Sequence, residues 1–513
     1  MNAMSPVDMP DSEPLDVLIV GAGISGIGMA AKLWEHCPAR RYLIVDRREG
    51  LGGTWDLFRY PGIRSDSDMH TFAYKFAPWT SDETIASAQQ IRDYLGKVVE
   101  DRGIGARMRF GVKVESADWD SATGLWQVRT VQAGDRAETI ACRFLFLGTG
   151  YYDYDQPHDA GIPELARFKG EVIHPQFWPD DYDYSGKRVV VIGSGATAVS
   201  VVPAMARDAA HVTMLQRTPT WYGIRPNRDD LASRIRRWLP AKWAWALNRE
   251  RALRMHEFLF RRARAKPRDM GDLLKAMVRK ELGPAYNEAD YTPPYNPWEQ
   301  RLCLVPDADM FAAIREGRAS VVTGEIESVE ADGVLLRDGR RLAADVIVTA
   351  TGLRLATLGK IRVSLDGAPV DPARHYWYRN CMFSNVPNLA VLFGYLNAGW
   401  TLRVDLVTDW LCRLFVQMDA WQKDVVTPVL ADESTLVEDQ PLDLLSSGYL
   451  QRGKHLVPRS ATKAPWRISM NYREDKAEMG RAPIDDGVLR FARAGRDIAA
   501  EPPARVPSAA TLP

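Results

Sequence analysis

One pattern of apolar and polar positions occurs twice along the chain. A short apolar run, at 16–20 and again at 187–192, leads into a glycine-rich turn, and the first turn is followed by a segment of helical character at 27–33. Apolar runs of this length indicate buried strands, and the order strand, turn, helix is typical of a βαβ unit. We find no internal repeat beyond these two units.

Other apolar segments complete the predicted elements. Strands are predicted at 42–45 and 211–215. The segments 144–147 and 345–348 run into GTGYY and TATGL, small-residue stretches where we expect the chain to cross between two domains. The amphipathic spacing of 402–418 predicts a core helix.

Composition narrows the class of protein. With 513 residues, 46% of them hydrophobic and 26% charged, the chain is expected to form a soluble α/β protein of roughly three domains. The formal net charge is zero, which argues against nucleic-acid binding or general adhesion to membranes. The N-terminal segment has no export signal pattern and no apolar run has the ~20 residues of a membrane span, so we expect a cytoplasmic protein.

The cysteines point away from redox-active dithiols and metals. They are odd in number, scattered and never arranged as CxxC, which argues against a disulfide scaffold, a zinc site or a disulfide reductase. We therefore predict no metal site. The five are Cys37, Cys142, Cys303, Cys381 and Cys412.

The first glycine turn, GAGISG, predicts a dinucleotide site. Gly21 permits the tight turn, Gly23 lets the backbone approach a pyrophosphate, and Gly26 lets helix and strand pack closely. Asp46, about 20 residues further on at the end of the next strand, is placed to accept hydrogen bonds from a ribose 2′-hydroxyl and would repel a 2′-phosphate. The first nucleotide is thus expected to be FAD or NAD. An ordinary glycine turn is the alternative.

Residues 52–68 follow directly and are rich in glycine, proline and aromatic residues. We expect an extended loop along the cofactor, because a flavin ring needs flat apolar contacts and hydrogen bonds at its edge. A structural loop packed by its aromatic residues is the alternative. The polar and aromatic candidates are Thr54, Trp55, Arg64 and Asp66.

The second glycine turn, GSGATA, predicts a different nucleotide. The strand that follows it ends in Gln216 and Arg217 rather than in an acid, and an arginine here accommodates a 2′-phosphate. NADPH is therefore favoured over NADH, although Arg217 could also be an ordinary surface residue. The predicted contacts are Gly193, Ser194, Gly195, Ala196, Thr197, Ala198, Arg217 and Thr218.

The segment FKGEVIHPQFWPD, residues 168–180, matches the FxGxxxHxxxW(P/D) fingerprint of the Baeyer-Villiger monooxygenases. The loop at 52–66 matches a second motif of that family, GGxWxxxxYPGxxxD. Stretches such as YNPWEQRLCLVP look most like the ethionamide-activating subgroup. The resemblance covers nearly the whole chain and is weakest at 225–291 and in the tail.

This resemblance implies two Rossmann-like domains, one for FAD built from both ends of the chain and one for NADPH inserted between them, with a helical insertion in the latter. The implied boundaries are 1–150 and 353–495 for the FAD domain, 151–224 and 296–352 for the NADPH domain, 225–295 for the insertion, and 496–513 for a disordered tail.

The resemblance also implies a reaction. NADPH reduces FAD, O2 adds to give a C4a-peroxyflavin, and this intermediate converts a ketone to an ester or lactone. Arg301 is the implied positive group and Asp66 the carboxylate that orients it; a structural ion pair is the alternative. Gln300 stands where many members place a lysine, so Arg217 is expected to carry more of the 2′-phosphate contact. We expect His174 to be structural.

The resemblance also implies further contacts with the cofactor and the substrate. Asn397 and Trp400 lie where a helix start faces the flavin, and we expect the substrate pocket to be lined by residues around Trp400 and from the insertion. The implied FAD contacts are Ser25, Gly53, Thr54, Trp55, Asp56, Leu57 and Val114.

Residues 225–281 carry 17 Lys and Arg against 7 Asp and Glu, with three interleaved tryptophans. We favour helices whose charged faces are solvated and whose aromatic residues pack inward. Weak peripheral contact with an anionic membrane is the alternative.

Two other functions remain open. The same flavin chemistry could oxygenate sulfur or nitrogen in place of a ketone, and a nucleotide-binding sensor without activity is the non-enzymatic alternative. The physiological ketone and the oligomeric state do not follow from the sequence.

Overall fold

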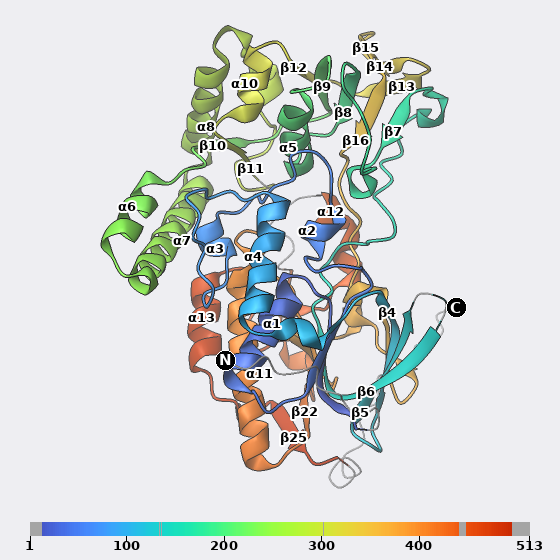
Figure 1. The fold of residues 1–513 in the computed structure, drawn as a ribbon, viewed down its shortest axis with the longest axis vertical. Helices are drawn as coiled ribbons and strands as arrows, with labels where there is room; N and C mark the ends of the chain where they lie inside the picture. Colours follow the sequence, from blue (N-terminus) through green and yellow to red (C-terminus); the bar gives the residue numbers. More distant parts are fainter. Residues whose placement is uncertain (1–12, 133, 135, 301, 441–447, 495–513) are drawn as a thin grey trace.

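The computed structural model describes residues 13–132, 134, 136–300, 302–440 and 448–494. Two sheets dominate it, and in Figure 1 the second lies above the first. The first sheet takes strands from 15–147 and from 362–391, whereas the second takes its strands from 171–349, between them. The prediction of two Rossmann-like domains with a helical insertion is confirmed.

The first sheet has nine strands and is mixed. Its centre is parallel, with β1 lying between β2 and β6; β2 is apolar and buried, as is the end of β6 at 144–147 that pairs with β1. Burial on both faces explains why these strands read as continuous apolar runs. In sheet order the strands are β18 (Ala368–Pro369), β17 (Arg362–Leu365), β4 (Val112–Asp120), β5 (Leu125–Gln132), β6 (Arg136–Leu147), β1 (Leu15–Val20), β2 (Tyr42–Val45) and β3 (Met108–Arg109), with β21 (Leu389–Val391) also paired to β6.

The second sheet is parallel and has five strands. Their order is β12 (Ala319–Thr323), β9 (His211–Gln216), β8 (Arg188–Ile192), β16 (Val346–Thr349) and β7 (Glu171–Ile173). An antiparallel sheet of β13 (Ile326–Glu330), β14 (Gly333–Leu336) and β15 (Arg341–Ala343) precedes β16 in the chain. Small two-stranded sheets pair β10 (Tyr222–Arg225) with β11 (Cys303–Pro306), β19 (Trp377–Tyr378) with β20 (Met382–Phe383), β22 (Val425–Pro428) with β25 (Leu489–Ala492), and β23 (Glu438–Asp439) with β24 (Ser460–Ala461).

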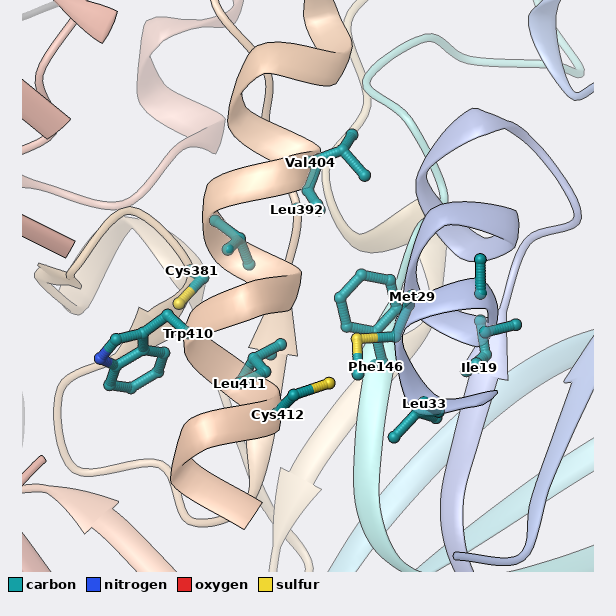
Figure 2. Close-up of a cluster of buried hydrophobic side chains, with 14 of the residues drawn as sticks. Ile19, Met29, Leu33, Phe146, Cys381, Leu392, Val404, Trp410, Leu411 and Cys412 are labelled. Atoms are coloured by element: carbon teal, nitrogen blue, oxygen red, sulfur yellow. The ribbon is translucent and has the colours of Figure 1, made fainter. Parts of the chain in front are cut away.

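Helices α1 (Ile24–His36) and α11 (Trp400–Trp421) pack together on one face of the first sheet. Figure 2 shows Met29 and Leu33 of α1, Phe146 of β6 and Leu411 of α11 pointing into the same interior. The predicted helix at 402–418 is confirmed and extends beyond its apolar pattern at both ends, from Trp400 to Trp421. The other helices of this domain are α2 (Thr54–Leu57), α3 (Met69–Phe72), α4 (Ala88–Asp101), α12 (Gly448–Gly453) and α13 (Tyr472–Arg481), while α5 (Ala196–Met205) and α10 (Asp309–Arg315) belong with the second sheet.

The insertion is helical; α6 (Asp230–Trp238) and α7 (Ala241–Ala265) lie at the outer left edge of Figure 1, and α8 (Pro267–Leu282) lies above them beside α10. The insertion also includes α9 (Glu288–Tyr291). A buried ion pair anchors it: Arg249 of α7 donates to Asp405 of α11 at 2.9 Å and to the carbonyl oxygen of Ala73 at 2.7 Å. Burial raises the pKa of Asp405 to about 6.

Two sequence-based expectations about this architecture are wrong in part. The stretch 52–68 is not wholly extended, because α2 forms one helical turn directly after Gly53, whose φ is +57°. In the insertion only Trp245 packs inward; Trp238 and Trp243 are 80% and 69% exposed. Among the described helices, none is long and apolar enough to cross a membrane. The predicted tail at 496–513 lies outside the described residues.

Candidate functional site

The first glycine turn is closed tightly between β1 and α1. Gly21 has φ +109°, and a Cβ there would lie 2.6 Å from the carbonyl oxygen of Gly148. A Cβ on Gly26 would lie only 1.9 Å from the carbonyl oxygen of Gly21. Gly23, at the start of α1, lies against Gly53, with 3.5 Å between its ideal Cβ and that residue's Cα. The turn therefore brings backbone N–H groups and the positive end of α1 to one open point.

Asp46 lies at the end of β2, beside this turn. Its carboxylate accepts hydrogen bonds from the backbone N–H of Ala22 at 2.6 Å and of Arg48 at 2.9 Å. Burial raises the pKa of Asp46, and these two hydrogen bonds oppose that shift. The carboxylate is thus fixed in orientation before any nucleotide binds, as a ribose-binding acid requires.

Two polar residues of the loop after β2, Thr54 and Asp56, face in different directions. Thr54 faces the cavity and shares a hydrogen bond with the phenol of Tyr154, whose pKa burial raises to about 12. Asp56 turns the other way, where it is buried and accepts a hydrogen bond from Arg48 Nε at 2.5 Å. Neither Asp56 nor Leu57 lines the cavity: Asp56 forms an ion pair and Leu57 packs in the core, so their implied FAD contacts stay a prediction that this geometry does not support.

An aromatic wall stands at the start of α11. Trp400 stacks on Tyr151 with 5.2 Å between ring centroids and 11° between planes, and its Nε1 donates to Ser25 Oγ at 2.9 Å. Asn397, just before the helix, donates to the carbonyl oxygen of Met470 at 3.1 Å. Ser25, Asn397 and Trp400 were predicted from distant parts of the sequence and now line one cavity.

The second glycine turn is built on the same plan but is more open. Gly193 has φ +129°, and a Cβ there would lie 2.3 Å from the carbonyl oxygen of Ala350, in parallel with the contact between Gly21 and Gly148. At Gly195, by contrast, a Cβ would meet nothing within 4 Å. Ser194 Oγ donates to the carbonyl oxygen of Thr218 at 3.3 Å, which ties the turn to the end of β9.

Arg217 follows β9 directly and is exposed; within the described part of the chain it forms no ion pair. Its neighbour Gln216 is buried and donates to the carbonyl oxygen of Asp290 at 2.8 Å. The guanidinium is therefore available to an anionic group beside the second turn.

One cavity of about 1040 Å³ reaches from the first turn to Ala196 and Thr197 of the second motif. The other residues predicted for the second nucleotide do not line it: Gly193, Ser194, Gly195, Ala198, Arg217 and Thr218. The cavity runs from the first turn, past the loop at 52–68, to the N-terminal turn of α5. There Tyr60, whose pKa burial raises to about 12, shares a hydrogen bond with Thr197. The predicted residues that line it are Gly21, Gly23, Ser25, Asp46, Gly53, Thr54, Trp55, Arg64, Asp66, Val114, Ala196, Thr197, Asn397 and Trp400.

The predicted catalytic residues are only partly described. Asp66 lines the cavity and is exposed to it, and its carboxylate accepts a hydrogen bond from Ser67 Oγ at 3.2 Å. Arg301 lies outside the described residues, so its pairing with Asp66 stays a prediction. Arg64 does not pair with Asp66 in the described contacts. Its guanidinium pairs instead with Asp309 of α10, with one contact at 3.2 Å.

The insertion supplies the apolar end of the cavity. Side chains of α7 and α8 line it, and His256 of α7 reaches back to the backbone of Asn397. Burial lowers the pKa of His256, which keeps the imidazole neutral near pH 7. Sequence analysis placed the pocket on the insertion without naming its residues, which include Met255, Leu259, Met270, Leu273, Leu274 and Met277.

Sequence analysis missed an ion pair across the cavity. Arg225, at the end of β10, donates to Asp68 Oδ2 at 2.7 Å and to Thr84 Oγ1 at 2.9 Å. Asp68 directly follows the recognised loop motif, but Arg225 belongs to the divergent segment. No local signal could have joined them.

The segment 168–180 forms the outer edge of the second sheet. A Cβ on Gly170 would lie 2.3 Å from the carbonyl oxygen of Asp345, and Trp178 is buried edge-on against Tyr184. His174 Nδ1 accepts a hydrogen bond from the backbone N–H of Gln176 at 3.1 Å. His174 does not line the large cavity, in keeping with a structural role.

The cavity fits two dinucleotides. Each turn begins with a glycine, Gly21 or Gly193, whose Cβ would clash with backbone, and each leads into a helix N-terminus. Two buried polar atoms of residues that line the cavity, Thr149 Oγ1 and Asn397 Oδ1, have no hydrogen-bond partner among the described residues. Unpaired buried oxygens are unfavourable unless a ligand satisfies them. The fold and the site together define a flavoprotein oxidoreductase with two nucleotide sites.

Comparisons with known proteins identify the family. The family model described as pyridine nucleotide-disulphide oxidoreductase matches residues 18–257. The chain is 43% identical over 490 residues to a probable FAD-binding monooxygenase, AlmA, of an Acinetobacter species, covering 95% of this chain and 98% of that protein. It is 43% identical over 484 residues to the FAD-containing monooxygenase EthA of Mycobacterium tuberculosis, covering 94% and 98%.

A solved structure described as oxidized steroid monooxygenase bound to NADP superimposes with a TM-score of 0.75 at 22% identity, covering 94% of this chain and all of that one. A cyclohexanone monooxygenase bound to epsilon-caprolactone superimposes with a TM-score of 0.71 at 20% identity, covering 93% and 99%. The chain belongs to the FAD-containing monooxygenases, and the sequence-based recognition is confirmed.

Proposed function

We propose that this protein is an NADPH- and O2-dependent FAD monooxygenase that converts ketones to esters or lactones. The single observation that carries the proposal is the continuous cavity, which joins the first glycine turn, the N-terminal turn of α5 and an apolar chamber. A hydride donor, a flavin and an apolar substrate need to meet in such an arrangement.

FAD is proposed for the first turn. Asp46 accepts hydrogen bonds from the ribose, the N-terminal turn of α1 stabilises the pyrophosphate, and Trp400 with Tyr151 forms a flat wall for the ring. When bound, the reduced flavin supplies the chemistry that activates O2. Thr54 and Ser25 lie along the same wall and can donate hydrogen bonds to polar atoms of the cofactor.

NADPH is proposed for the second turn. The N-terminal turn of α5 and the exposed guanidinium of Arg217 supply positive potential for the phosphates, and Thr197 lines the cavity on the same side. The wide opening around Gly195 allows this nucleotide to enter and leave.

Substrate is proposed to occupy the end of the cavity lined by α7 and α8. Its methionine and leucine side chains exclude water, which protects a reactive oxygen species from unproductive decay. Asp66 is proposed to orient the guanidinium of Arg301, which would stabilise negative charge developing on the substrate oxygen.

A product screen tests the reaction class. The purified holoenzyme with NADPH and O2 is offered a ladder of linear, cyclic and aryl ketones beside simple thioethers, and products are identified by mass spectrometry. Ester or lactone is expected from at least one ketone. Sulfoxide alone, or no ketone-stimulated NADPH oxidation, would contradict the proposal.

Arg301→Ala tests the catalytic assignment. Flavin reduction by NADPH is expected to persist, whereas oxygenated product is lost by about 100-fold or more. The matched control is Arg207→Ala, an exposed arginine of the second domain that does not line the cavity. Ester formation at the normal rate in Arg301→Ala would show that the residue is misassigned.

A further inference from the structure

The exposed apolar side chains of this protein gather on the insertion. Of the fourteen large apolar residues that are exposed in the described chain, eight lie in α6, α7, α8 or the α6–α7 connection. They are Leu231, Trp238, Leu239, Trp243, Leu247, Met255, Phe258 and Leu273. Soluble surfaces carry apolar residues scattered singly, whereas exposed apolar residues concentrated on one group of helices are typical of a binding surface.

The group has a definite geometry. On α6, Leu231 and Trp238 are seven residues apart and share one face. On α7, Trp243 and Leu247 are four residues apart and also share a face. The two helices are joined only by residues 239–240 and pack against each other as a hairpin, so Trp238 and Trp243 lie at its end, here called the α6–α7 tip.

The tip is rigid rather than loose. Arg251 of α7 pairs with Asp229 at the N-cap of α6, and Arg236 of α6 pairs with Asp82 in the FAD domain. Trp245 lies buried, with its Nε1 donating to the carbonyl oxygen of Lys75 at 3.2 Å. The inward tryptophan fixes α7, and the outward tryptophans are thereby held in solvent.

The charge at the tip is of one sign. Residues 231–249 contain no Asp or Glu, and Arg234, Arg237 and Lys242 are exposed, with no ion-pair partner in the described part of the chain. A second copy of this surface would bring like charges together. An anionic lipid surface matches both features, because tryptophan prefers the membrane interface and Lys and Arg are attracted to acidic headgroups.

The cavity opens toward the same helices. Met255 and Leu273 line the cavity and are themselves 55% and 51% exposed, so they lie at its mouth. Met255 is twelve residues along α7 from Trp243, about 18 Å by the rise of an α-helix. A surface that received the tip would thus lie near the entrance for apolar molecules.

We propose that the α6–α7 tip docks this protein peripherally on anionic lipid membranes, with Trp238 and Trp243 in the interface and Arg234, Arg237 and Lys242 at the headgroups. The docking itself does not depend on the proposed reaction. The proposal uses Trp238 and Trp243, which the sequence led us to expect inside the insertion and which the structure exposes.

Vesicle sedimentation tests the proposal. The full-length holoprotein, without substrate, is mixed with vesicles of phosphatidylcholine, with or without phosphatidylglycerol, at low and high salt. Binding is expected only with phosphatidylglycerol and is expected to weaken as salt screens the charges. Wild-type protein that stays in the supernatant with anionic vesicles would overturn the proposal.

Two variants locate the contact. Trp238→Ser with Trp243→Ser is expected to weaken vesicle binding by about tenfold or more, and a triple charge reversal of Arg234, Arg237 and Lys242 to Glu is expected to abolish it. Bound flavin and thermal unfolding should be unchanged in the double variant, because neither tryptophan lines the cavity or joins the core.

Trp34→Ser is the matched control, since Trp34 is 51% exposed but lies on α1. Equal loss of vesicle binding in this control would overturn the assignment to the tip. So would size-exclusion chromatography in which the wild type is a dimer and the double variant a monomer, because the tip would then be a contact between copies.

Discussion

The two glycine turns follow one plan but differ in how tightly the protein closes around them. At the first, Gly21 and Gly26 are pressed against backbone, Gly23 is in van der Waals contact with Gly53, and Asp46 is held by two N–H groups. At the second, only Gly193 is pressed, and Gly195 and Arg217 face open space. A closed turn with a fixed acid suits a cofactor that stays bound, whereas an open turn with an exposed cation suits a nucleotide that exchanges at each turnover.

Gly26→Ala should have the largest effect on the structure, because it is the one substitution here that strains the fold itself. Its Cβ would lie 1.9 Å from the carbonyl oxygen of Gly21, so helix and strand would have to separate and the turn would lose its shape. We expect bound FAD to fall by about tenfold or more, or the protein to fail to fold. The ratio of flavin to protein absorbance in the purified protein measures this. Full flavin content would contradict the closed description of the first turn.

Arg217→Ala should act on the other nucleotide alone. Loss of a charge-assisted hydrogen bond worth about 1.5–3 kcal/mol raises the KM for NADPH by about 10- to 100-fold, while KM for NADH and the FAD content stay nearly constant. Steady-state kinetics with both nucleotides gives the comparison. Equal changes for NADPH and NADH would rule out a 2′-phosphate contact.

Asp46→Asn should weaken FAD binding by about tenfold. The amide keeps the size of the side chain but removes the charge, and one of its two polar atoms can no longer accept a hydrogen bond from Ala22 or Arg48. Release of flavin on dilution, followed by fluorescence, measures the loss. If the KM for NADPH changed instead, the assignment of the two nucleotides would be reversed.

Gly195→Ala should have the smallest effect. Gly195 precedes α5 as Gly23 precedes α1, and the position that corresponds to Gly26 is already alanine, Ala198. Gly195 has φ −77°, which alanine adopts without strain, and its Cβ would meet nothing within 4 Å. We expect unchanged FAD content and less than about a threefold change in KM for NADPH. A large loss of flavin here would break the contrast between the turns.

The strands around both turns were predictable because burial on two faces leaves a simple signal. The predicted strand at 42–45 coincides with β2, and the strand predicted at 16–20 differs from β1 by one residue. The long helix α11 was found from its apolar spacing. The one-turn helix α2 was missed, because four residues carry no periodicity and the turn is set by Gly53.

The site was predictable where the residues belong to a motif and not where partners decide their role. Ser25 and Trp400 were both named, but their hydrogen bond depends on how α1 and α11 pack. Asp56 was named as a cofactor contact, yet the nearby Arg48 draws it away from the cavity. A motif fixes which residue is present, and its neighbours in space fix which way it points.

Sequence by itself determined the strand and turn pattern, the acid after the first turn and the arginine after the second, because these follow from local spacing and chemistry. Tertiary structure decided that one cavity runs from the first turn to the start of α5, that Arg225 pairs with Asp68 across it, and that Trp238 and Trp243 face outward while Trp245 faces inward. Those outcomes depend on which surfaces the insertion finds to pack against, and residues distant in the chain supply those surfaces.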